Sequence, residues 1–394
     1  MKPVTNPLPL LPMHLTQSMG TLHSWPFAMQ LANAESLPLK NSLKQKLNDP
    51  KLHQALQNHA RNESKALCDA IKRYIDTPHI RTLIEPPCIW QQGSARLLDY
   101  GQLEGPECDQ LMLFVPSLIN RYTILYLNEQ RSMMRFLRSQ GVYPIVLDWG
   151  TPSNNQQHDN ISDNITNILL PAIDHIHDMS GEAVSLGGYC MGGILALAAA
   201  QLRPLKIDRL ALFATPWNFH CDTFKPLILD DDYQGILAEL IDSQDMIAAE
   251  MIQALFYVTD PFVFEEKFKR FATMKEGSPA ARDFIAREHW VNDGVPMTRG
   301  VAQDCLVYWA QQNQLAKNKW KVANRIIRPE KISQPTFIAI PKQDHVVPHD
   351  CAWPLAELIP HAHVIHPNAG HVGMIAGGRA KRECWNPLLE WLQF

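Results

Sequence analysis

The pattern of hydrophobic and polar positions changes near residues 90, 214 and 333. Between residues 91 and 214, short apolar runs of strand length alternate with longer segments whose apolar residues recur at helical spacing. We expect strands at 110–115, 143–147 and 183–186, and helices at 131–139 and 161–179. Such an alternation is typical of a parallel sheet flanked by helices.

The other three stretches have patterns of their own. Residues 1–90 join a proline-rich start to helical signals from Lys51 to Ile75, so we expect a helical or irregular extension. Residues 215–333 consist of helical segments rich in Phe, Met and Trp, which we interpret as a cap inserted into the sheet domain. Residues 334–394 return to the sheet pattern and end in a predicted helix from Asn386 to Leu392. The predicted domains are therefore 1–90, 91–214, 215–333 and 334–394, with the second and fourth sharing one core.

Residues 186–194 carry the most specific chemical signal in the sequence. They read Leu-Gly-Gly-Tyr-Cys-Met-Gly-Gly-Ile, a Gly-x-nucleophile-x-Gly pattern with Cys190 at the nucleophile position. A strand at 183–186 precedes the pattern and a helix-forming run at 194–200 follows it, as a nucleophile elbow requires. Gly188 and Gly192 leave space for a tight turn in which the cysteine is strained. The alternative is a structural cysteine in a glycine-rich turn, and the flanking strand and helix argue against it.

Two later segments supply the other groups that a nucleophilic cysteine needs. Asp344 follows a predicted strand at 335–340, and His371 lies in a glycine-flanked loop before the last predicted helix. The order nucleophile, acid, base is that of the α/β-hydrolases and differs from the chymotrypsin and subtilisin orders. We therefore expect an α/β-hydrolase fold, with a mostly parallel central sheet and a helical cap insertion. The expected catalytic residues are Cys190, Asp344 and His371.

Backbone N–H groups are expected to stabilise the oxyanion of an acyl transfer at Cys190. One donor would be the residue after the nucleophile, Met191, and the second would come from the loop after the third strand, at Leu118 or its neighbour Ile119. His371 would take the thiol proton while Asp344 holds the imidazole in its tautomer. Because a thioester passed to a cysteine gives another thioester, the acyl group would stay activated for a further transfer.

Several blocks of the sequence resemble the polyhydroxyalkanoate synthases, and most closely their two-component type. The family's lipase-like box with cysteine corresponds to Gly188–Gly193, and the pair Asp344-His345 and the loop at 370–373 match two further blocks. The segments 115–125, 144–152 and 215–219 also match family blocks in the same order along the chain, and the similarity extends from about residue 93 to the C-terminus.

Two positions depart from the family pattern. Tyr126 replaces an acidic residue, and Asn218 replaces an aspartate. These changes leave the expected triad intact, but they affect positions connected with subunit contacts and substrate preference.

The resemblance implies a function. It implies an acyltransferase that polymerises 3-hydroxyacyl-CoA into polyhydroxyalkanoate and releases CoA, through an acyl group on Cys190 and without metal or cofactor. It also implies a homodimer, a second synthase subunit and the surface of a polymer granule as partners, in the cytoplasm.

Two other functions remain open. A hydrolase with a cysteine nucleophile, such as an acyl-CoA thioesterase or a polyhydroxyalkanoate depolymerase, would give the acyl group to water. A non-catalytic granule-associated protein would keep the fold alone, and the presence of all three expected catalytic residues argues against it.

Apolar side chains of the predicted cap have two interpretations. They could line an acyl channel, or they could form the cap's own core, which we favour for most of them. A cap would also exclude water, which a polymerising enzyme needs because hydrolysis ends the chain. The residues concerned are Met246, Met251, Phe256, Phe262, Phe264, Phe268, Phe271 and Trp290.

Composition agrees with a cytoplasmic enzyme. Of the 394 residues, 46% are hydrophobic and 19% charged, which is ordinary for a globular protein. A net charge of −4 without a basic stripe gives no reason to expect nucleic acid. The eight cysteines are scattered without zinc spacing, which favours a reducing compartment. We expect no membrane span, since no apolar run is long enough, and no signal peptide, because prolines interrupt the first apolar run.

Overall fold

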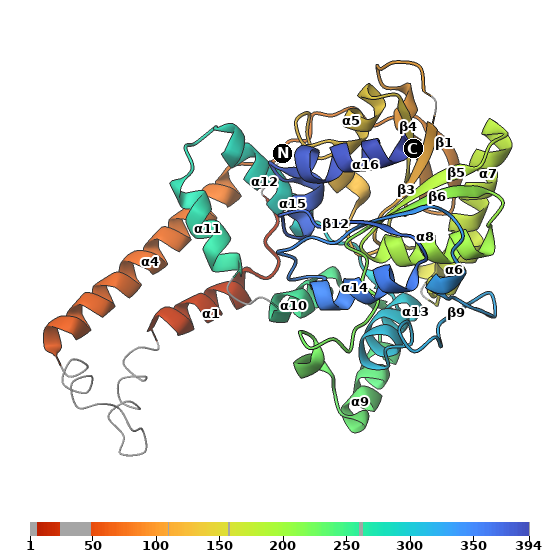
Figure 1. Cartoon of the computed structure of the whole chain (residues 1–394). Coiled ribbons are helices and arrows are strands. Elements are labelled where there is room, and N and C mark those ends of the chain that lie inside the picture. Colours follow the sequence, from red (N-terminus) through yellow and green to blue (C-terminus); the bar gives the residue numbers. More distant parts are fainter. Residues whose placement is uncertain (1–5, 24–48, 109, 157, 260–262, 394) are drawn as a thin grey trace. The chain divides into compact units, whose positions relative to one another are not determined.

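The computed structural model describes residues 6–23, 49–108, 110–156, 158–259 and 263–393 (Figure 1). Its contacts divide the chain into two compact units. One contains Met1–Ile80 and Gln253–Asn292, and the other contains Arg81–Ile252 and Asp293–Phe394. The N-terminal stretch therefore shares a unit with part of the predicted cap, and the four-part division of the sequence stays a prediction.

The larger unit is built on a sheet of eight strands in the order β1-β2-β4-β3-β5-β6-β11-β12. β2 pairs antiparallel with β1 and β4, whereas all the pairs from β4 to β12 are parallel. The predicted mostly parallel sheet is confirmed. The strands are β1 (Cys88–Gln92), β2 (Ala95–Asp99), β3 (Gln110–Val115), β4 (Val142–Asp148), β5 (Val184–Tyr189), β6 (Ile207–Phe213), β11 (Thr336–Ala339) and β12 (His363–Ile365).

Helices cover both faces of this sheet, with α5 and α16 on one face and α8 on the other (Figure 1). Every residue of α8 except Gln201 is buried, because its alanines and leucines favour a helix and pack closely against β5. The expected helix at 161–179 forms α6, a π-helical segment and α7 in succession. The main helices of this unit are α5 (Met133–Ser139), α6 (Ile161–Asn164), α7 (Leu170–Ser180), α8 (Met191–Leu202), α9 (Asp231–Asp242), α13 (Arg299–Ala302), α14 (His349–Leu358), α15 (His371–Ala376) and α16 (Asn386–Leu392).

The smaller unit is helical and has a core of its own. The expected helix at 51–75 is confirmed as α4 (Pro50–Asp76), whose first turn is capped by the side chain of Asp49. The unit also contains α1 (Leu11–His23), α11 (Val263–Thr273) and α12 (Pro279–Asn292), while α10 (Ala249–Thr259) crosses the boundary between the two units in the sequence.

Aromatic side chains of the predicted cap fill the core of the smaller unit. Phe264, Phe268 and Phe271 are at most 3% exposed and pack with Tyr74 of α4 and Phe284 of α12. They are packing residues, as we favoured. Their partners, however, include α4 from the N-terminal stretch and not only the predicted cap. Among the other residues named for this role, Trp290 is buried and Met251 is exposed, while Phe262 and the side chain of Phe256 lie outside the described residues.

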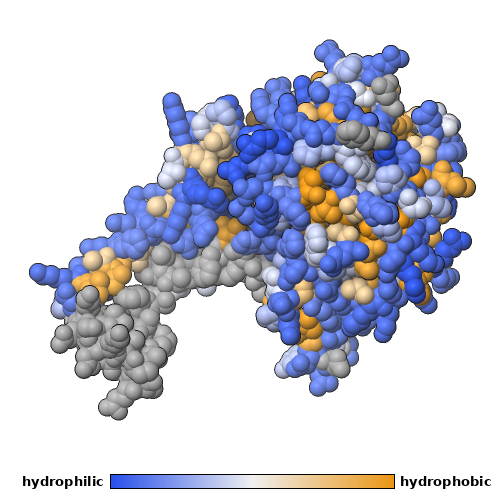
Figure 2. Space-filling view, in the orientation of Figure 1, coloured by the Kyte–Doolittle hydropathy of each residue, from blue (hydrophilic) through white to orange (hydrophobic). Residues whose placement is uncertain are grey.

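The visible surface is largely hydrophilic, with scattered hydrophobic residues (Figure 2). The helix α9 contributes exposed apolar side chains, since Ile236 and Leu240 are at least 50% exposed. Among the described helices, none is both long and apolar enough to cross a membrane.

Candidate active site

Cys190 lies between the last residue of β5 and the first residue of α8, in the turn expected of a nucleophile elbow. Its backbone angles are φ 55° and ψ −124°, which a residue other than glycine adopts only where the surrounding structure enforces them. Two hydrogen bonds hold this turn. The N–H of Cys190 donates to the carbonyl of Phe213 at 2.8 Å, and the N–H of Gly193 donates to the carbonyl of Cys190 at 2.9 Å. The turn is thus fixed against β6, and the side chain of Cys190 is half-buried.

The glycines of the elbow are required by close backbone contacts. A Cβ atom on Gly188 would lie 2.4 Å from the Cα of Gly193, and one on Gly192 would lie 2.0 Å from the carbonyl oxygen of Val115. Neither neighbour is a flexible side chain that could move away. The Gly-x-Cys-x-Gly spacing therefore allows the start of α8 to lie directly against the end of β3.

Asp344 and His371 meet as the sequence predicts. The Nδ1 atom of His371, at the start of α15, lies 2.7 Å from Oδ2 of Asp344, which follows β11. The other carboxylate oxygen, Oδ1, accepts hydrogen bonds from the N–H groups of Val346 at 2.9 Å and Val347 at 2.8 Å. The side chain of His371 is 10% exposed and that of Asp344 is 0% exposed. The pair is therefore shielded from solvent, and the two backbone hydrogen bonds hold the carboxylate in place. The neighbouring His345 is exposed.

The third residue, Cys190, lies close enough to His371 to raise the pKa of its imidazole. Burial by itself lowers the pKa of His371, but the charges of Asp344 and Cys190 and their hydrogen bonds outweigh it and raise the pKa to about 10. An imidazole between a carboxylate and a thiol sulfur is therefore stabilised in its protonated form. This arrangement can accept a proton from a thiol and later return it to a leaving group.

The predicted oxyanion donors, the N–H groups of Met191 and Leu118, belong to segments that meet next to Cys190. Met191 is the first residue of α8, so its N–H belongs to the first turn, where amide groups lack partners within the helix. The neighbouring Gly192 packs against the carbonyls that lead into the loop of Leu118. In that loop the N–H of Ile119 donates to Oγ of Ser117 at 3.2 Å, which favours Leu118 over Ile119 as the second donor.

One contact in the site was not anticipated from the sequence. The ring of Tyr189 lies 5.1 Å from that of His371, and its hydroxyl donates to the carbonyl of His371 at 3.4 Å. Tyr189 is 3% exposed and is the last residue of β5, directly before Cys190, so it contacts His371 from the residue next to the nucleophile. The aromatic residue preceding the nucleophile was the available signal, but the sequence does not show that its ring reaches His371.

The two departures from the family pattern have structural roles. Tyr126 is buried against Tyr100, with ring centroids 4.7 Å apart, and Arg81 donates to its carbonyl at 3.3 Å. Asn218 accepts a hydrogen bond from Nδ2 of Asn313 at 2.8 Å. Tyr126 is thus a packing residue, while Asn218 joins two loops through a neutral side-chain hydrogen bond.

Comparison with protein families agrees with this geometry. The family model of the α/β hydrolase fold matches residues 150–377, which is more than half of the chain. The chain belongs to the α/β-hydrolase-fold family. The predicted fold class is confirmed, since the matched region contains the elbow, Asp344 and His371.

The predicted resemblance to polyhydroxyalkanoate synthases is confirmed by curated relatives of this α/β hydrolase. A poly(3-hydroxyalkanoate) polymerase subunit PhaC of Haloferax mediterranei is 29% identical over 308 residues, covering 77% of this chain and 62% of the relative. The protein of the same name from Allochromatium vinosum is 23% identical, covering 84% of this chain and 94% of the relative. This chain therefore spans less than two thirds of the Haloferax protein. Among solved structures, an enol-lactonase from Burkholderia xenovorans LB400 is similar with a TM-score of 0.47 and 15% identity, covering 76% of this chain and 96% of that one.

Proposed function

We propose that this chain is a polyhydroxyalkanoate synthase-like acyltransferase, which polymerises 3-hydroxyacyl-CoA and releases CoA. The observation that carries the proposal is the hydrogen bond between His371 and Asp344, together with Cys190 in the strained elbow turn, in a chain whose relatives are named poly(3-hydroxyalkanoate) polymerase subunits. In this proposal Cys190 is the nucleophile, His371 the base and Asp344 the residue that orients the base.

The first half of the reaction transfers the acyl group from CoA to Cys190. The thiolate of Cys190 attacks the thioester carbonyl, and the resulting oxyanion accepts hydrogen bonds from the N–H groups of Met191 and Leu118. The C–S bond to CoA then breaks, and the imidazolium of His371 gives its proton to the departing CoA thiolate. The product is a thioester between the acyl group and Cys190. Its energy is similar to that of the CoA thioester, so the acyl group stays activated.

The second half extends the polymer. The 3-hydroxyl of another acyl unit attacks the thioester carbonyl on Cys190, an ester bond forms and the C–S bond breaks. The hydroxyl proton passes to His371, and Cys190 leaves as the thiolate. Asp344 compensates the positive charge on the imidazole during both halves.

We also propose a substrate, partners and a location for this chain. A CoA thioester is the substrate, and a second synthase subunit, a homodimer and the surface of a cytoplasmic polymer granule are the proposed partners. The Haloferax and Allochromatium relatives are both named as polymerase subunits, which supports the need for a second chain.

Product analysis separates this function from hydrolysis. Purified protein is incubated with 3-hydroxybutyryl-CoA, and CoA release, insoluble polyester and free 3-hydroxybutyrate are measured together. We expect polyester to account for most of the released CoA, and Cys190→Ala to release none. Free acid equal to the released CoA would favour a thioesterase, whereas wild-type protein that releases no CoA, alone or with a second subunit, would favour a non-catalytic role.

A further inference from the structure

Trp149 directly follows β4 and reaches into the loop that carries the proposed oxyanion donor. Its indole N–H donates to the carbonyl of Pro116 at 3.0 Å, in a buried position. Since β3 and β4 are parallel neighbours, their carboxyl ends lie side by side. The bond therefore joins the residue after β4 to the residue after β3, two positions before Leu118.

The same stretch of loop also contacts the elbow. A Cβ on Gly192 would lie 2.7 Å from the carbonyl oxygen of Pro116, so α8 begins in direct contact with the peptide group to which Trp149 donates. This peptide group is held between the indole of Trp149 and the backbone of the elbow. The N–H of Leu118 belongs to the next peptide group along the chain. Rotating the peptide group of the Pro116 carbonyl would therefore move this N–H.

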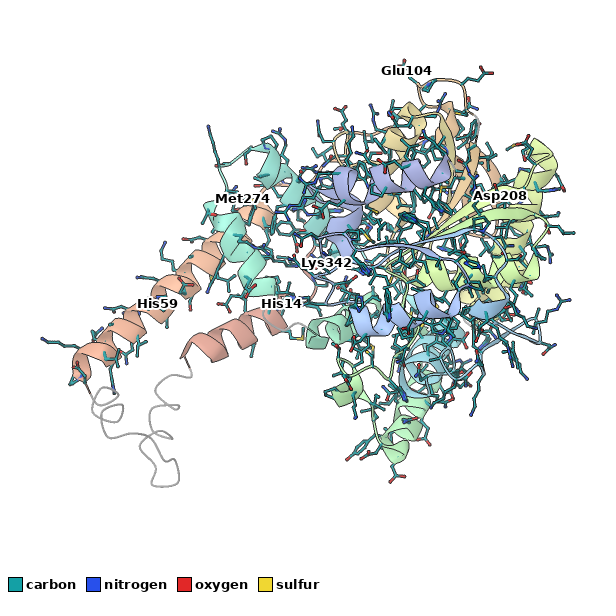
Figure 3. The ribbon with its side chains drawn as sticks, in the orientation of Figure 1. His14, His59, Glu104, Asp208, Met274 and Lys342 are labelled. Carbon is teal, nitrogen blue, oxygen red and sulfur yellow. The ribbon has the colours of Figure 1, made fainter. Side chains whose placement is uncertain are left out.

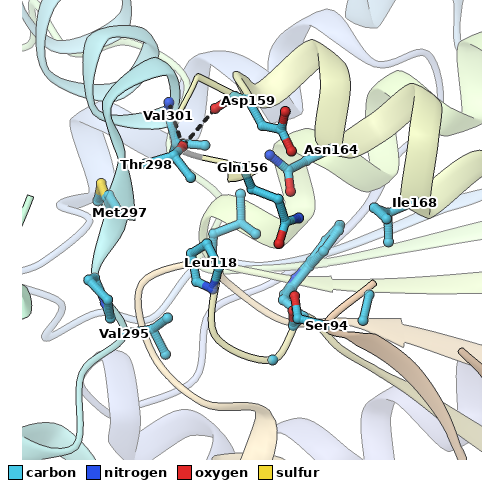
Figure 4. A pocket seen from close by; sticks show the side chains of 15 residues that line it. Ser94, Leu118, Gln156, Asp159, Asn164, Ile168, Val295, Met297, Thr298 and Val301 are labelled. Atoms are coloured by element: carbon cyan, nitrogen blue, oxygen red, sulfur yellow. Dashed lines mark hydrogen bonds between the residues drawn. The ribbon is translucent and has the colours of Figure 1, made fainter. Parts of the chain in front are cut away.

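Trp149 is itself fixed by polar contacts. The hydroxyl of Ser94 donates to the carbonyl of Trp149 at 2.9 Å. Asp148 accepts from the N–H of Gly150 at 3.0 Å through Oδ1, and from Arg96 at 2.7 Å through Oδ2. Trp149 and the half-buried Leu118 line one pocket of the larger unit, in which Leu118 and Ser94 are labelled (Figure 4). The indole is therefore a rigid hydrogen-bond donor to the loop that carries Leu118.

We propose that Trp149 is a positioning residue that sets the orientation of the Leu118 N–H toward the oxyanion. This inference rests on the proposed acyl transfer at Cys190, but it holds whether water or a hydroxyl group accepts the acyl group. The physical basis is that a hydrogen-bond donor stabilises a transition state only when it is already aimed at the position of the developing charge.

Trp149→Phe tests the inference, because phenylalanine keeps an aromatic ring and removes the N–H donor. The chain offers a matched control in Trp309, which is 2% exposed in the same unit. Within the described part of the structure its indole N–H has no hydrogen-bond partner. Trp309→Phe therefore makes the same change in volume without breaking a hydrogen bond.

The measurement is the CoA-release rate from 3-hydroxybutyryl-CoA in the first turnover, together with kcat, KM and Tm. We expect Trp149→Phe to lower the acylation rate and kcat about 10- to 100-fold relative to Trp309→Phe. KM should change less than about threefold, because an oxyanion donor acts in the transition state rather than in substrate binding. If Trp149→Phe does not fold, Ser94→Ala keeps the indole and loosens its backbone, and we expect it to lower kcat in the same way.

Three results would overturn the inference while leaving the proposed function intact. The first is an equal change of kcat in Trp149→Phe and Trp309→Phe. The second is an effect of Trp149→Phe on KM alone. The third applies if Trp149→Phe does not fold, and it is an unchanged kcat in Ser94→Ala. Wild-type protein without CoA release, or Cys190→Ala with full CoA release, would contradict the proposed function and this inference together.

Discussion

At the scale of single residues, the chemistry depends on a histidine held between two partners of different kinds. Asp344 is fixed by two backbone N–H groups and binds Nδ1 of His371, which leaves the other ring nitrogen available for proton transfer. The order of Asp344 and His371 along the chain was sufficient to predict their hydrogen bond. The support that Tyr189 gives to His371 was not predictable, because a side chain's reach depends on how β5 and α15 are placed.

Substitutions in the triad should have graded effects on the rate. We expect His371→Gln to lower the CoA-release rate roughly 10³-fold or more, because no other group can take the thiol proton. Asp344→Asn should also impair the rate, since the asparagine no longer compensates the charge of the imidazolium or fixes its tautomer. His345→Ala is the control, as this neighbour is exposed and has no assigned role. A larger loss in His345→Ala than in His371→Gln would show that the base is wrongly assigned.

At the scale of elements, backbone contacts decide where the nucleophile and its neighbours lie. The alternation of apolar runs predicted the central strands and helices, because each buried element needs a continuous apolar face. The pairing of α4 with α11 and α12 was not predictable, since the residues that meet are about two hundred positions apart and share no local pattern. The sequence was sufficient to recognise the cap aromatics as packing residues, but not to show that they pack against α4.

Gly192→Ala tests the contact between α8 and the end of β3. The added methyl group would lie 2.0 Å from the carbonyl oxygen of Val115, so either α8 or the oxyanion loop must shift. We expect a loss of kcat of about 10-fold or more together with a lower Tm. Gly235→Ala is the control, because a Cβ on this glycine of α9 would meet nothing within 4 Å and should stabilise the helix by about 0.5–1 kcal/mol. Wild-type activity and Tm in Gly192→Ala would contradict the described packing.

His14 should make the smaller unit sensitive to acid. It stacks on Phe264 with ring centroids 3.8 Å apart, and burial, followed by the charge of Lys267, lowers its pKa to about 4. An unfolded histidine titrates near pH 6.5, so below that pH the unfolded state binds a proton that the folded state does not. The stabilising contribution is therefore complete above about pH 6.5 and is lost as the pH falls toward 4.

Hydrogen exchange in α1 and α4, corrected for the intrinsic rate, measures this effect. Between pH 7 and pH 4.5 we expect the wild-type protein to lose on the order of 2 kcal/mol of protection, and His14→Phe to lose much less. The exposed His59 of α4, labelled with His14 in Figure 3, provides the control His59→Phe, which should behave as wild type. Equal acid sensitivity in His14→Phe and His59→Phe would contradict the assignment.

At the scale of the whole molecule, an α/β-hydrolase sheet with a cysteine elbow accounts for the larger unit and its proposed chemistry. The fold class and the meeting of Asp344 with His371 were predictable, because their motifs are short and lie at strand ends, where this fold brings them together. The division into two units was not, because it depends on contacts between Met1–Ile80 and Gln253–Asn292 that leave no periodic signal in the sequence.

The central claim is that Cys190 carries the acyl group during turnover. The direct measurement is mass spectrometry of the protein quenched during reaction with 3-hydroxybutyryl-CoA, followed by digestion and mapping of the modified peptide. We predict a 3-hydroxybutyryl group, or a short oligomer of it, on the peptide that contains Cys190, and its absence in Cys190→Ala. CoA release at the wild-type rate by Cys190→Ala, or an acyl group found on another residue, would contradict the account.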